Sequence, residues 1–343
     1  MEKLKVRISV RNLVEFILRS GDLDNSRGSS GDKEAMLKGG RLHRKIQRSM
    51  KGNYQAEVSL KRESEYEDVI IQVEGRADGI FTEDGEFWID EIKGTYGNLQ
   101  AMEVPVPVHR AQAMCYGWIY GEKEGLSQIG IQMTYSHLDT EDTRRFREIF
   151  SMEELKNWYQ KLLDDYHKWI SCSLSWKKER NASMKDLQFP FPYREGQREI
   201  VSGVYHTVSS KKTLFVQAPT GVGKTMSAIF PSVRAIGEGK GETLFYLTAK
   251  TITGTVAWEA FHTLRENGLK FKVTAITAKE KLCFLDSPEC TPEKCPYAKG
   301  HFDRVNDAVF DLLQKSNLFT REEVLAQAKE YQVCPFEMSL DVA

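Results

Sequence analysis

The pattern of apolar and polar positions differs between the first and the second half of this chain, which predicts two domains. The spacing of Val10, Leu13 and Ile17 places three apolar side chains on one face and predicts an amphipathic opening helix. Alternating positions then predict strands, and helical spacing returns twice before residue 178. The expected strands are 55–61, 69–81 and 86–93, and the expected helices are 108–121 and 151–170. This order is typical of an α+β domain.

The second half alternates between helix and strand patterns, as in a parallel α/β sheet. Its apolar runs Thr213–Gln217 and Thr243–Leu247 are the expected strands. The halves are separated by the polar stretch 177–183 and by Phe189-Pro190-Phe191-Pro192, which is extended because each proline biases its predecessor away from helix. We therefore expect an α+β domain over 1–178, a linker over 179–192 and an α/β domain over 193–343.

Composition narrows the class of protein without deciding its partner. The 343 residues suffice for about two domains, and 41% hydrophobic residues can fill two cores. Because 48 Lys and Arg face 49 Asp and Glu, the overall charge neither supports nor excludes binding to DNA. No apolar run approaches membrane-spanning length, so we expect a cytoplasmic protein without membrane contact. The sequence gives no indication of the oligomeric state.

A glycine-rich loop follows the first apolar run of the second half. Its residues are Ala218, Pro219, Thr220, Gly221, Val222, Gly223, Lys224 and Thr225. Backbone N–H groups in such a loop can cradle a triphosphate at a helix N-terminus, while Lys224 adds a charge and Thr225 a hydroxyl for Mg²⁺. Ala218 replaces the glycine that usually begins this pattern, and it keeps the residue small. The loop predicts ATP binding, with a chance glycine-rich turn as the alternative.

A hairpin in the first half aligns two acidic residues. The turn Asp84-Gly85 sets Asp78 directly opposite Glu91, where Cβ atoms lie about 4.5–5.5 Å apart and two carboxylates repel unless a cation separates them. Lys93 shares the face of Glu91, so the pattern suits phosphodiester hydrolysis with Mg²⁺ or Mn²⁺. A slip of one residue would bring Asp90 opposite Asp78 instead. A charged surface hairpin without catalytic function is the other alternative.

Motifs around this hairpin resemble the PD-(D/E)xK nucleases of the RecB-like branch, which includes the CRISPR-associated adaptation nucleases. The matching segments are Gly75-Arg76-Ala77-Asp78, Asp90-Glu91-Ile92-Lys93-Gly94-Thr95 and Gln112-Ala113-Met114-Cys115-Tyr116. An upstream helical histidine of that family is matched by Gly40-Arg41-Leu42-His43. The resemblance covers residues 1 to about 170 and implies a restriction-endonuclease-like α+β fold.

The resemblance also implies a function for each matching side chain. By it, the metal ligands are His43, Asp78 and Glu91, Lys93 is catalytic, and Gln112 and Tyr116 line the active site or the DNA path. The last two are spaced i, i+4 and therefore project from one helical face. Some members of the family carry an iron–sulfur cluster in this domain, but only Cys115 and Cys172 are available here. We expect both to be packing residues.

Two segments near the phosphate loop resemble superfamily 2 helicases. Tyr193-Arg194-Glu195-Gly196-Gln197 resembles the adenine-reading Q-motif, in which the amide of Gln197 would offer a donor and an acceptor to the base. A solvated helix residue is the alternative for Gln197. Leu247-Thr248-Ala249-Lys250-Thr251 stands where these helicases have motif Ia, which contacts the nucleic-acid backbone, and Lys250 could neutralise a phosphate there.

Four cysteines are crowded near the end of the chain. Cys283, Cys290, Cys295 and Cys334 form the pattern C-x6-C-x4-C-x38-C. Four thiolates bind an iron–sulfur cluster or zinc, and the spacing lacks the paired C-x2-C knuckles usual for structural zinc. After a phosphate loop and motif Ia, and ending in Cys334-Pro335-Phe336-Glu337, the pattern resembles the cluster insertion of the DinG/XPD group of DNA helicases. That resemblance implies a 4Fe-4S cluster within 280–338.

One helicase element is missing from the sequence. No Asp-Glu-Ala-His box follows residue 225, so we expect ATP hydrolysis by this chain to be slow or absent. The chain is expected to be the N-terminal part of a longer protein, truncated before that box. The expected fold is α/β overall, with the nuclease-like domain followed by a partial RecA-like P-loop domain that carries the iron–sulfur insertion.

The expected function is that of an ATP-dependent DNA helicase of the DinG/XPD type with a fused metal-dependent nuclease. Its expected partner is DNA that is single-stranded or has single-stranded ends, and its process is DNA repair or recombination. Two alternatives remain open. One is a non-catalytic nucleic-acid-binding P-loop module with a structural zinc site, and the other is a P-loop NTPase of another class, such as a transporter ATPase or a kinase.

Overall fold

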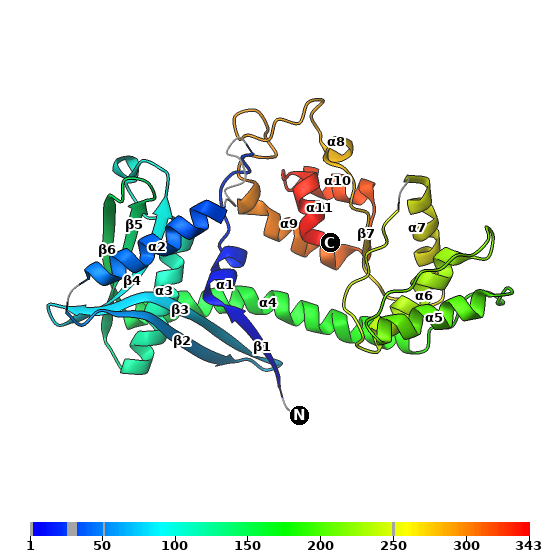
Figure 1. Ribbon diagram of the computed structural model, residues 1–343, viewed down its shortest axis with the longest axis horizontal. Coiled ribbons are helices and arrows are strands. Elements are labelled where there is room, and N and C mark those ends of the chain that lie inside the picture. Colours follow the sequence, from blue (N-terminus) through cyan, green and yellow to red (C-terminus); the bar gives the residue numbers. More distant parts are fainter. Residues whose placement is uncertain (1–2, 26–32, 51, 249–250) are drawn as a thin grey trace. The chain divides into compact units, whose positions relative to one another are not determined.

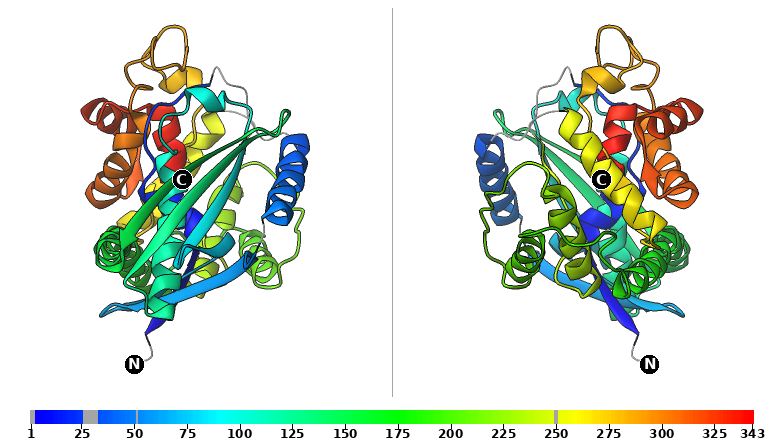
Figure 2. Two further views of the ribbon diagram at one scale, coloured as in Figure 1. Left: turned by 90° about the vertical axis from the view of Figure 1, so that its left-hand side faces the viewer. Right: turned by 90° about the vertical axis from the view of Figure 1, so that its right-hand side faces the viewer.

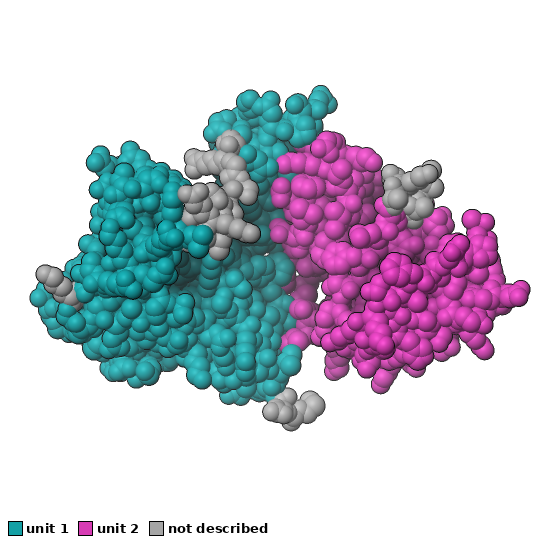
Figure 3. Space-filling view, in the orientation of Figure 1, with its two compact units in different colours: residues 1–171, 284–307, 331–334 teal, residues 172–283, 308–330, 335–343 magenta. Residues whose placement is uncertain are grey.

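The computed structural model describes residues 3–25, 33–50, 52–248 and 251–343, and their contacts divide the chain into two compact units (Figure 3). Unit 1 comprises 1–171, 284–307 and 331–334, and unit 2 comprises 172–283, 308–330 and 335–343. The expected linker over 179–192 is wrong in its first part, because helix α4 (Met152–Lys185) continues through it. No glycine or proline interrupts 152–185, and the polar residues of 177–183 are mostly good helix formers.

Unit 1 is built on a mixed sheet, which the described residues form from six strands (Figure 1). The strands are β1 (Leu4–Ser9), β2 (Gln55–Glu65), β3 (Val69–Glu83), β4 (Glu86–Thr95), β5 (Gln128–His137) and β6 (Thr143–Ser151). Their order is β1-β3-β4-β5-β6, and β2 also pairs with β3. The β1–β3 and β4–β5 pairs are parallel and the other pairs are antiparallel. The three strands predicted from alternation are thus confirmed as β2, β3 and β4.

The register of the β3–β4 hairpin is the one predicted from its turn. Asp84 and Gly85 have φ values of 52° and 85°, as a two-residue turn with both central residues left-handed requires. Glu83 pairs with Glu86, and Gly79 pairs with Asp90. Continued by one step, this register sets residue 78 opposite residue 91, so the slipped alternative is wrong.

Helices cover the sheet and carry part of the candidate site. In unit 1 these are α1 (Val10–Ile17), the 3-10 helix η1 (Leu99–Ala101), α2 (Lys33–Ser49) and α3 (Pro107–Glu124). Helix α3 is buried on nearly all sides over 111–121 because it lies between the sheet and α4. A Cβ atom added at Gly117 would lie 3.4 Å from the side chains of Ile131 on β5 and Leu155 on α4. This packing fixes the face that α3 turns toward β4.

Unit 2 has a helical core. The elements within or entering it are α5 (Gln197–Ser209), α6 (Lys224–Gly237), α7 (Thr251–Glu266), α8 (Lys279–Leu282), α9 (His301–Lys315), α10 (Arg321–Glu330) and α11 (Pro335–Val342), with the short strands β7 (Val273–Thr274) and β8 (Leu318–Phe319). Buried side chains of α6 and α7, such as Ile229, Val233 and Leu264, form the main cluster. β7 and β8 pair in parallel.

The strands expected at 213–217 and 243–247 are not formed in unit 2. Neither segment forms regular secondary structure or pairs with a strand among the described residues, and Phe215 and Leu247 are 93% and 88% exposed. An apolar run becomes a strand only when a neighbour accepts its backbone hydrogen bonds. The sequence pattern indicates only that these segments could form strands. Among the described residues, no strand lies beside either segment to pair with it.

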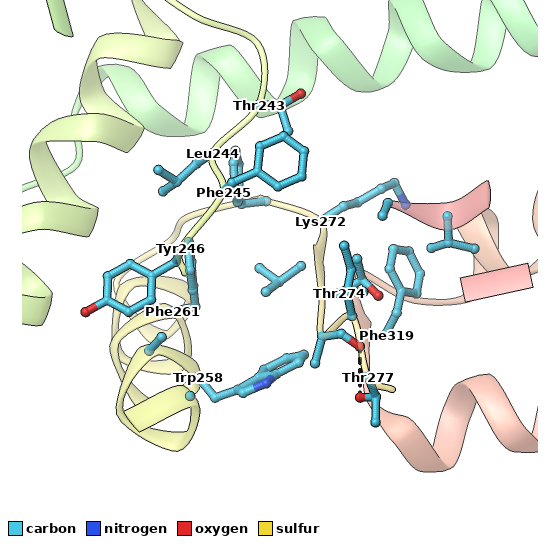
Figure 4. Close-up of a pocket in the computed structure, with 18 of the residues that line it drawn as sticks. Thr243, Leu244, Phe245, Tyr246, Trp258, Phe261, Lys272, Thr274, Thr277 and Phe319 are labelled. Atoms are coloured by element: carbon cyan, nitrogen blue, oxygen red, sulfur yellow. Dashed lines mark hydrogen bonds between the residues drawn. The ribbon is translucent and has the colours of Figure 1, made fainter. Parts of the chain in front are cut away.

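A cavity of about 900 Å³ borders the second of these segments (Figure 4). Residues 243–248 form one wall and residues 273–278 another, while Trp258, Phe261 and Phe319 add aromatic surface. The ammonium of Lys272 lies 4.5 Å from the centre of the Trp176 ring, and burial lowers its pKa. The expected parallel sheet is therefore reduced to the β7–β8 pair, with an apolar space beside it.

None of the helices formed by the described residues is long and apolar enough to cross a lipid bilayer.

Candidate functional site

The residues expected in the nuclease site come from four elements of unit 1. Asp78 lies on β3, Glu91 and Lys93 on β4, His43 on α2, and Gln112 and Tyr116 on α3. The two strands carry the acidic residues and the lysine. Helix α2 precedes these strands in the sequence, and α3 follows them. Each element is held by apolar packing of its own.

Lys93 links strand β4 to helix α3. Its Nζ atom lies 2.8 Å from Oε1 of Glu91 and donates a 2.7 Å hydrogen bond to Oε1 of Gln112. Strand alternation explains the first contact, since side chains two residues apart share a face. The ammonium is one-quarter exposed and Glu91 is almost fully buried, so this is a largely desolvated ion pair. The lysine is therefore fixed between a carboxylate and an amide.

Asp78 connects β3 with β4 and α2. Its Oδ2 atom accepts a 2.7 Å hydrogen bond from the backbone N–H of Ile92, and its Oδ1 atom lies 3.6 Å from Nδ1 of His43. Leu42 and Ile46 on α2 pack against Ile92 and anchor the helix to β4. His43 follows Leu42 in sequence, so the anchored helix turns its imidazole toward the carboxylate of Asp78.

Glu91 has the chemistry of an incomplete cation site. The pKa of its carboxyl is raised to about 7, mainly by burial and secondly by the charge of Asp78, while Lys93 opposes the change. Its Oε2 atom is buried and has no hydrogen-bond partner. A buried carboxylate oxygen without a partner is costly, and a divalent cation would satisfy it.

The metal site is not assembled as the side chains stand. Among the described residues, no three His, Cys, Asp or Glu side chains lie close enough together to hold a metal ion. The donor set of Asp78, Glu91 and His43 fits Mg²⁺ or Mn²⁺ by its chemistry, because carboxylate oxygens and an imidazole nitrogen are ligands of these ions. The metal therefore stays a prediction that the orphaned oxygen of Glu91 supports.

Tyr116 lies over the strand that carries Asp78. A Cβ atom added at Gly75 would lie 2.6 Å from the Tyr116 hydroxyl, so the glycine allows the ring to reach β3. Burial raises the pKa of Tyr116, and the charges of Glu91 and Asp78 raise it further. The phenol therefore stays protonated and can act as a hydrogen-bond donor at this site. Gly75 belongs to the Gly-Arg-Ala-Asp segment, which explains that glycine physically.

His109 is a candidate that the sequence analysis missed. It precedes Gln112 and Tyr116 by three and seven positions and so lies on the same face of α3. Its Nδ1 atom is 3.2 Å from the hydroxyl of Tyr135, which accepts a hydrogen bond from the backbone N–H of Val106. The pKa of His109 is lowered to about 4, mainly by burial and secondly by the charge of Lys93. The helical spacing alone could have indicated this residue.

We expect His109 to make the stability of the chain depend on pH. The unfolded chain takes up a proton at its ordinary pKa near 6.5, whereas the native imidazole resists protonation down to about pH 4. The free energy of unfolding therefore falls as the pH drops from about 6.5 to about 4. In His109→Gln, the loss between pH 7 and pH 5 should be about 1–2 kcal/mol smaller than in the wild type.

Urea denaturation at the two pH values measures this difference. The matched control is His262→Gln, because the His262 side chain is 66% exposed. That variant should follow the wild type. The same pH dependence in His109→Gln and in the wild type would contradict the assignment of a buried, neutral imidazole.

Asp90 lies on the opposite side of β4 from Glu91 and is fully buried. Its carboxylate accepts hydrogen bonds from Tyr54 Oη at 3.1 Å, from Gln132 Nε2 at 3.0 Å and from Thr134 Oγ1 at 2.6 Å. Burial raises its pKa, and the donors oppose that change. All available partners of Asp90 are structural, so it is not part of the nuclease site.

The phosphate loop in unit 2 has the backbone that its sequence predicts. Gly221 and Gly223 have φ values of 86° and 82°, which favour glycine. Gly223 precedes α6, and no side chain caps that helix end. The Nζ atom of Lys224 donates to the carbonyl oxygens of Ala218 at 2.9 Å and Pro219 at 2.8 Å. These features fit a bound triphosphate, since the first N–H groups of α6 have no side-chain acceptor.

Gln197 is not a solvated helix residue, because it is only 4% exposed. Its Oε1 atom accepts a 3.0 Å hydrogen bond from the N–H of Arg194, and its Nε2 atom lies where a Cβ atom on Gly223 would come within 2.4 Å. The expected adenine-reading residue is therefore in contact with the phosphate loop. At the other side of the loop, the hydroxyls of Tyr246 and Thr225 lie 3.3 Å apart. Lys250, expected in motif Ia, lies outside the described residues.

The expected iron–sulfur region is not one unit. Residues 284–307 and 331–334 belong to unit 1, and the rest of 280–338 belongs to unit 2. No three of the described ligand-type side chains form a metal-binding group. Cys290, Cys295 and Cys334 lie in unit 1 and Cys283 lies in unit 2, so the cluster stays a prediction from the sequence and we derive no step through it. Cys115 is buried, as expected of a packing residue.

Comparison with known proteins gives limited information. No protein-family model matches the chain. It is 40% identical over 47 residues to the probable ATP-dependent helicase MJ0942 of Methanocaldococcus jannaschii, which is 13% of this chain and 7% of that protein. The crystal structure of SSO0001 aligns with 46% of this chain and 75% of its own at 21% identity, but the TM-score of 0.31 carries no argument about the fold. The match spans only a small part of the helicase and indicates a relation to helicases only.

Proposed function

We propose that unit 1 is a Mg²⁺- or Mn²⁺-dependent DNA nuclease. The observation that supports this most is the buried Glu91 carboxylate, which binds Lys93 through one oxygen and leaves the other without a partner beside Asp78. A divalent cation would give that second oxygen a partner and offset the cost of burying it. The same pair is bonded to Gln112 on α3, so three of the residues expected from the nuclease resemblance meet at one point.

Each side chain has a definite task in this proposal. A bound Mg²⁺ or Mn²⁺ would supply Lewis-acid chemistry, namely polarisation of a phosphoryl oxygen and a lower pKa for the attacking water. Asp78, Glu91 and His43 hold the ion, while Lys93 orients the water and stabilises the charge that develops on the phosphate. Gln112 accepts a hydrogen bond from Lys93 and keeps the ammonium in place. Tyr116 donates a hydrogen bond to a phosphate oxygen of the DNA.

We propose further that the phosphate loop binds ATP and that the whole protein is a DNA helicase of the DinG/XPD type. The open N-terminus of α6, the contact of Gln197 with the loop and the 47-residue match to a helicase support this proposal. The partner is DNA that is single-stranded or has single-stranded ends. Four cysteines crowded between Cys283 and Cys334 favour a metal or cluster site in a reducing compartment such as the cytoplasm. The 4Fe-4S cluster stays a prediction from the cysteine pattern.

A cleavage assay with the full chain tests the nuclease. End-labelled single-stranded and duplex DNA are incubated with the protein in Mn²⁺, in Mg²⁺ and in EDTA. We expect cleavage of the single strand in Mn²⁺, no cleavage in EDTA, and recovery when Mn²⁺ is returned in excess. Binding of DNA without cleavage in either metal would overturn the proposal and favour the non-catalytic binding module.

A further inference from the structure

Helix α2 is attached to unit 1 by two of its sides. On the apolar side, Leu42 and Ile46 pack against Ile92 of β4. On the second side, His43 and Gln47 are spaced i, i+4 and both reach β3. The Nε2 atom of Gln47 donates to the backbone oxygen of Asp78 at 2.9 Å, next to the contact of His43 with the Asp78 carboxylate. The helix is therefore rigidly placed along the candidate nuclease site.

The third side of α2 carries three exposed arginines. Arg41, Arg44 and Arg48 are spaced i, i+3 and i+7, which puts them on one face at rises of about 4.5 and 6 Å. Figure 2 shows α2 in blue at the outer side of the sheet. One guanidinium nitrogen of Arg44 lies 3.7 Å from the position that a Cβ atom on Gly40 would take. Because Gly40 has no side chain, it adds no bulk between the arginines and the side that carries His43.

Two lysines of α2 have carboxylate partners. Lys38 pairs with Asp139 at 3.2 Å, and Lys45 pairs with Glu141. In the part of the chain that the structure describes, no carboxylate lies within ion-pair distance of the arginines of this face. Three like charges in a row repel one another and gain most from a polyanion that runs along the helix.

The chemistry of this face favours a nucleic-acid strand over the other anionic partners of basic helices. A helix that binds a lipid surface needs its apolar side free, whereas Leu42 and Ile46 are buried against β4. Guanidinium groups match the geometry of phosphate, and a row of them follows a chain of phosphates without reading its bases. The adjacent residue His43 belongs to the candidate metal site, so a strand held here lies beside that site.

We propose that Arg41, Arg44 and Arg48 form a phosphate track that holds single-stranded DNA along α2, independently of its sequence. The proposal deepens and rests on the nuclease function of unit 1, because it names how the substrate strand is held there. The track contributes affinity and position, and it takes no part in the chemical step.

The test compares two variants that each remove three charges from unit 1. The first is Arg41→Gln/Arg44→Gln/Arg48→Gln. The matched control is Lys61→Gln/Lys156→Gln/Lys161→Gln, whose lysines are exposed on β2 and α4. Fluorescence anisotropy with a labelled 20-nucleotide single strand, in EDTA and at 50–200 mM NaCl, gives Kd and its salt dependence. Melting temperature and Mn²⁺ binding by calorimetry establish that both variants stay folded with an intact metal site.

We expect the arginine variant to bind the strand about 10- to 100-fold more weakly at 100 mM NaCl. The slope of log K against log salt should fall by about 2, since each phosphate contact on a single strand contributes about 0.7. The control should stay within about twofold of the wild type. Equal losses in both variants, or an unchanged slope in the arginine variant, would overturn the track.

The outcome is separable from that of the nuclease proposal. Anisotropy in EDTA needs no cleavage, so a protein that binds through the arginines and never cleaves DNA refutes only the nuclease. A protein that cleaves DNA in Mn²⁺, while the arginine variant binds the strand as tightly as the wild type, refutes only the track.

Discussion

Replacing Lys93 with alanine is expected to reduce the Mn²⁺-dependent cleavage rate by about 10³-fold, which corresponds to about 4 kcal/mol of transition-state stabilisation. The ammonium lies between Glu91 and Gln112, so its removal takes away the group that we propose to orient the attacking water. It also leaves both oxygens of the buried Glu91 carboxylate without a partner, which raises the pKa of that carboxyl further and weakens its hold on a metal ion.

Single-turnover cleavage of a labelled single strand at saturating protein measures this effect. Saturation matters because it separates the chemical step from DNA binding, which should change by less than about threefold. Lys61→Ala is the matched control, since this lysine lies exposed on the neighbouring strand β2. Raising the Mn²⁺ concentration tenfold distinguishes lost metal affinity from lost catalysis. A Lys93→Ala rate equal to that of the wild type would remove Lys93 from the mechanism.

Lys224→Ala is expected to weaken ATP binding at least 100-fold, about 3 kcal/mol. In the structure the Lys224 ammonium is held by the carbonyl oxygens of Ala218 and Pro219 at the mouth of the loop. A triphosphate replaces these neutral acceptors with charged ones, so the lysine gains a stronger partner only when nucleotide is bound. Alanine cannot make that exchange, while the glycine backbone of the loop is unaffected.

Calorimetric titration of the full chain with Mg²⁺-ATP measures the loss. Lys240→Ala serves as the control, because Lys240 lies exposed beyond the end of α6. Its affinity for ATP should equal that of the wild type. If the wild type itself fails to bind ATP, the phosphate loop is only a glycine-rich turn. If both variants bind equally well, Lys224 does not contact phosphate.

The first half of the chain was readable from its sequence because short-range rules decide its structure. The Asp-Gly turn permits only one tight hairpin, and the alternation of side chains then fixes which carboxylate faces which side. The i, i+4 spacing likewise put Gln112 and Tyr116 on one face of α3. What the pattern did not indicate was the partner of Lys93, since the approach of α3 to β4 depends on long-range packing.

The structure of the second half could be predicted less well, because long-range contacts decide it. The apolar segments 213–217 and 243–247 have the composition of strands, but strand formation depends on a neighbour that local sequence does not specify. Helix α4 differs from the prediction in the opposite sense. The polar stretch 177–183 predicts a linker, but it contains no helix breaker and continues the helix. The orphaned oxygen of Glu91 and the neutral His109 depend on burial, which is a property of the assembled fold.

Asp90 and Glu91 are neighbours on β4 but face opposite sides of the sheet, and the two-residue turn fixes which side each of them faces. Asp90 is surrounded by three donors, whereas Glu91 has one oxygen to spare. A shift of the β4 register by one residue would exchange their sides and would place Asp90, which already has three donors, at the candidate metal site. The length of the turn therefore decides which of the two acids has an oxygen available for a cation.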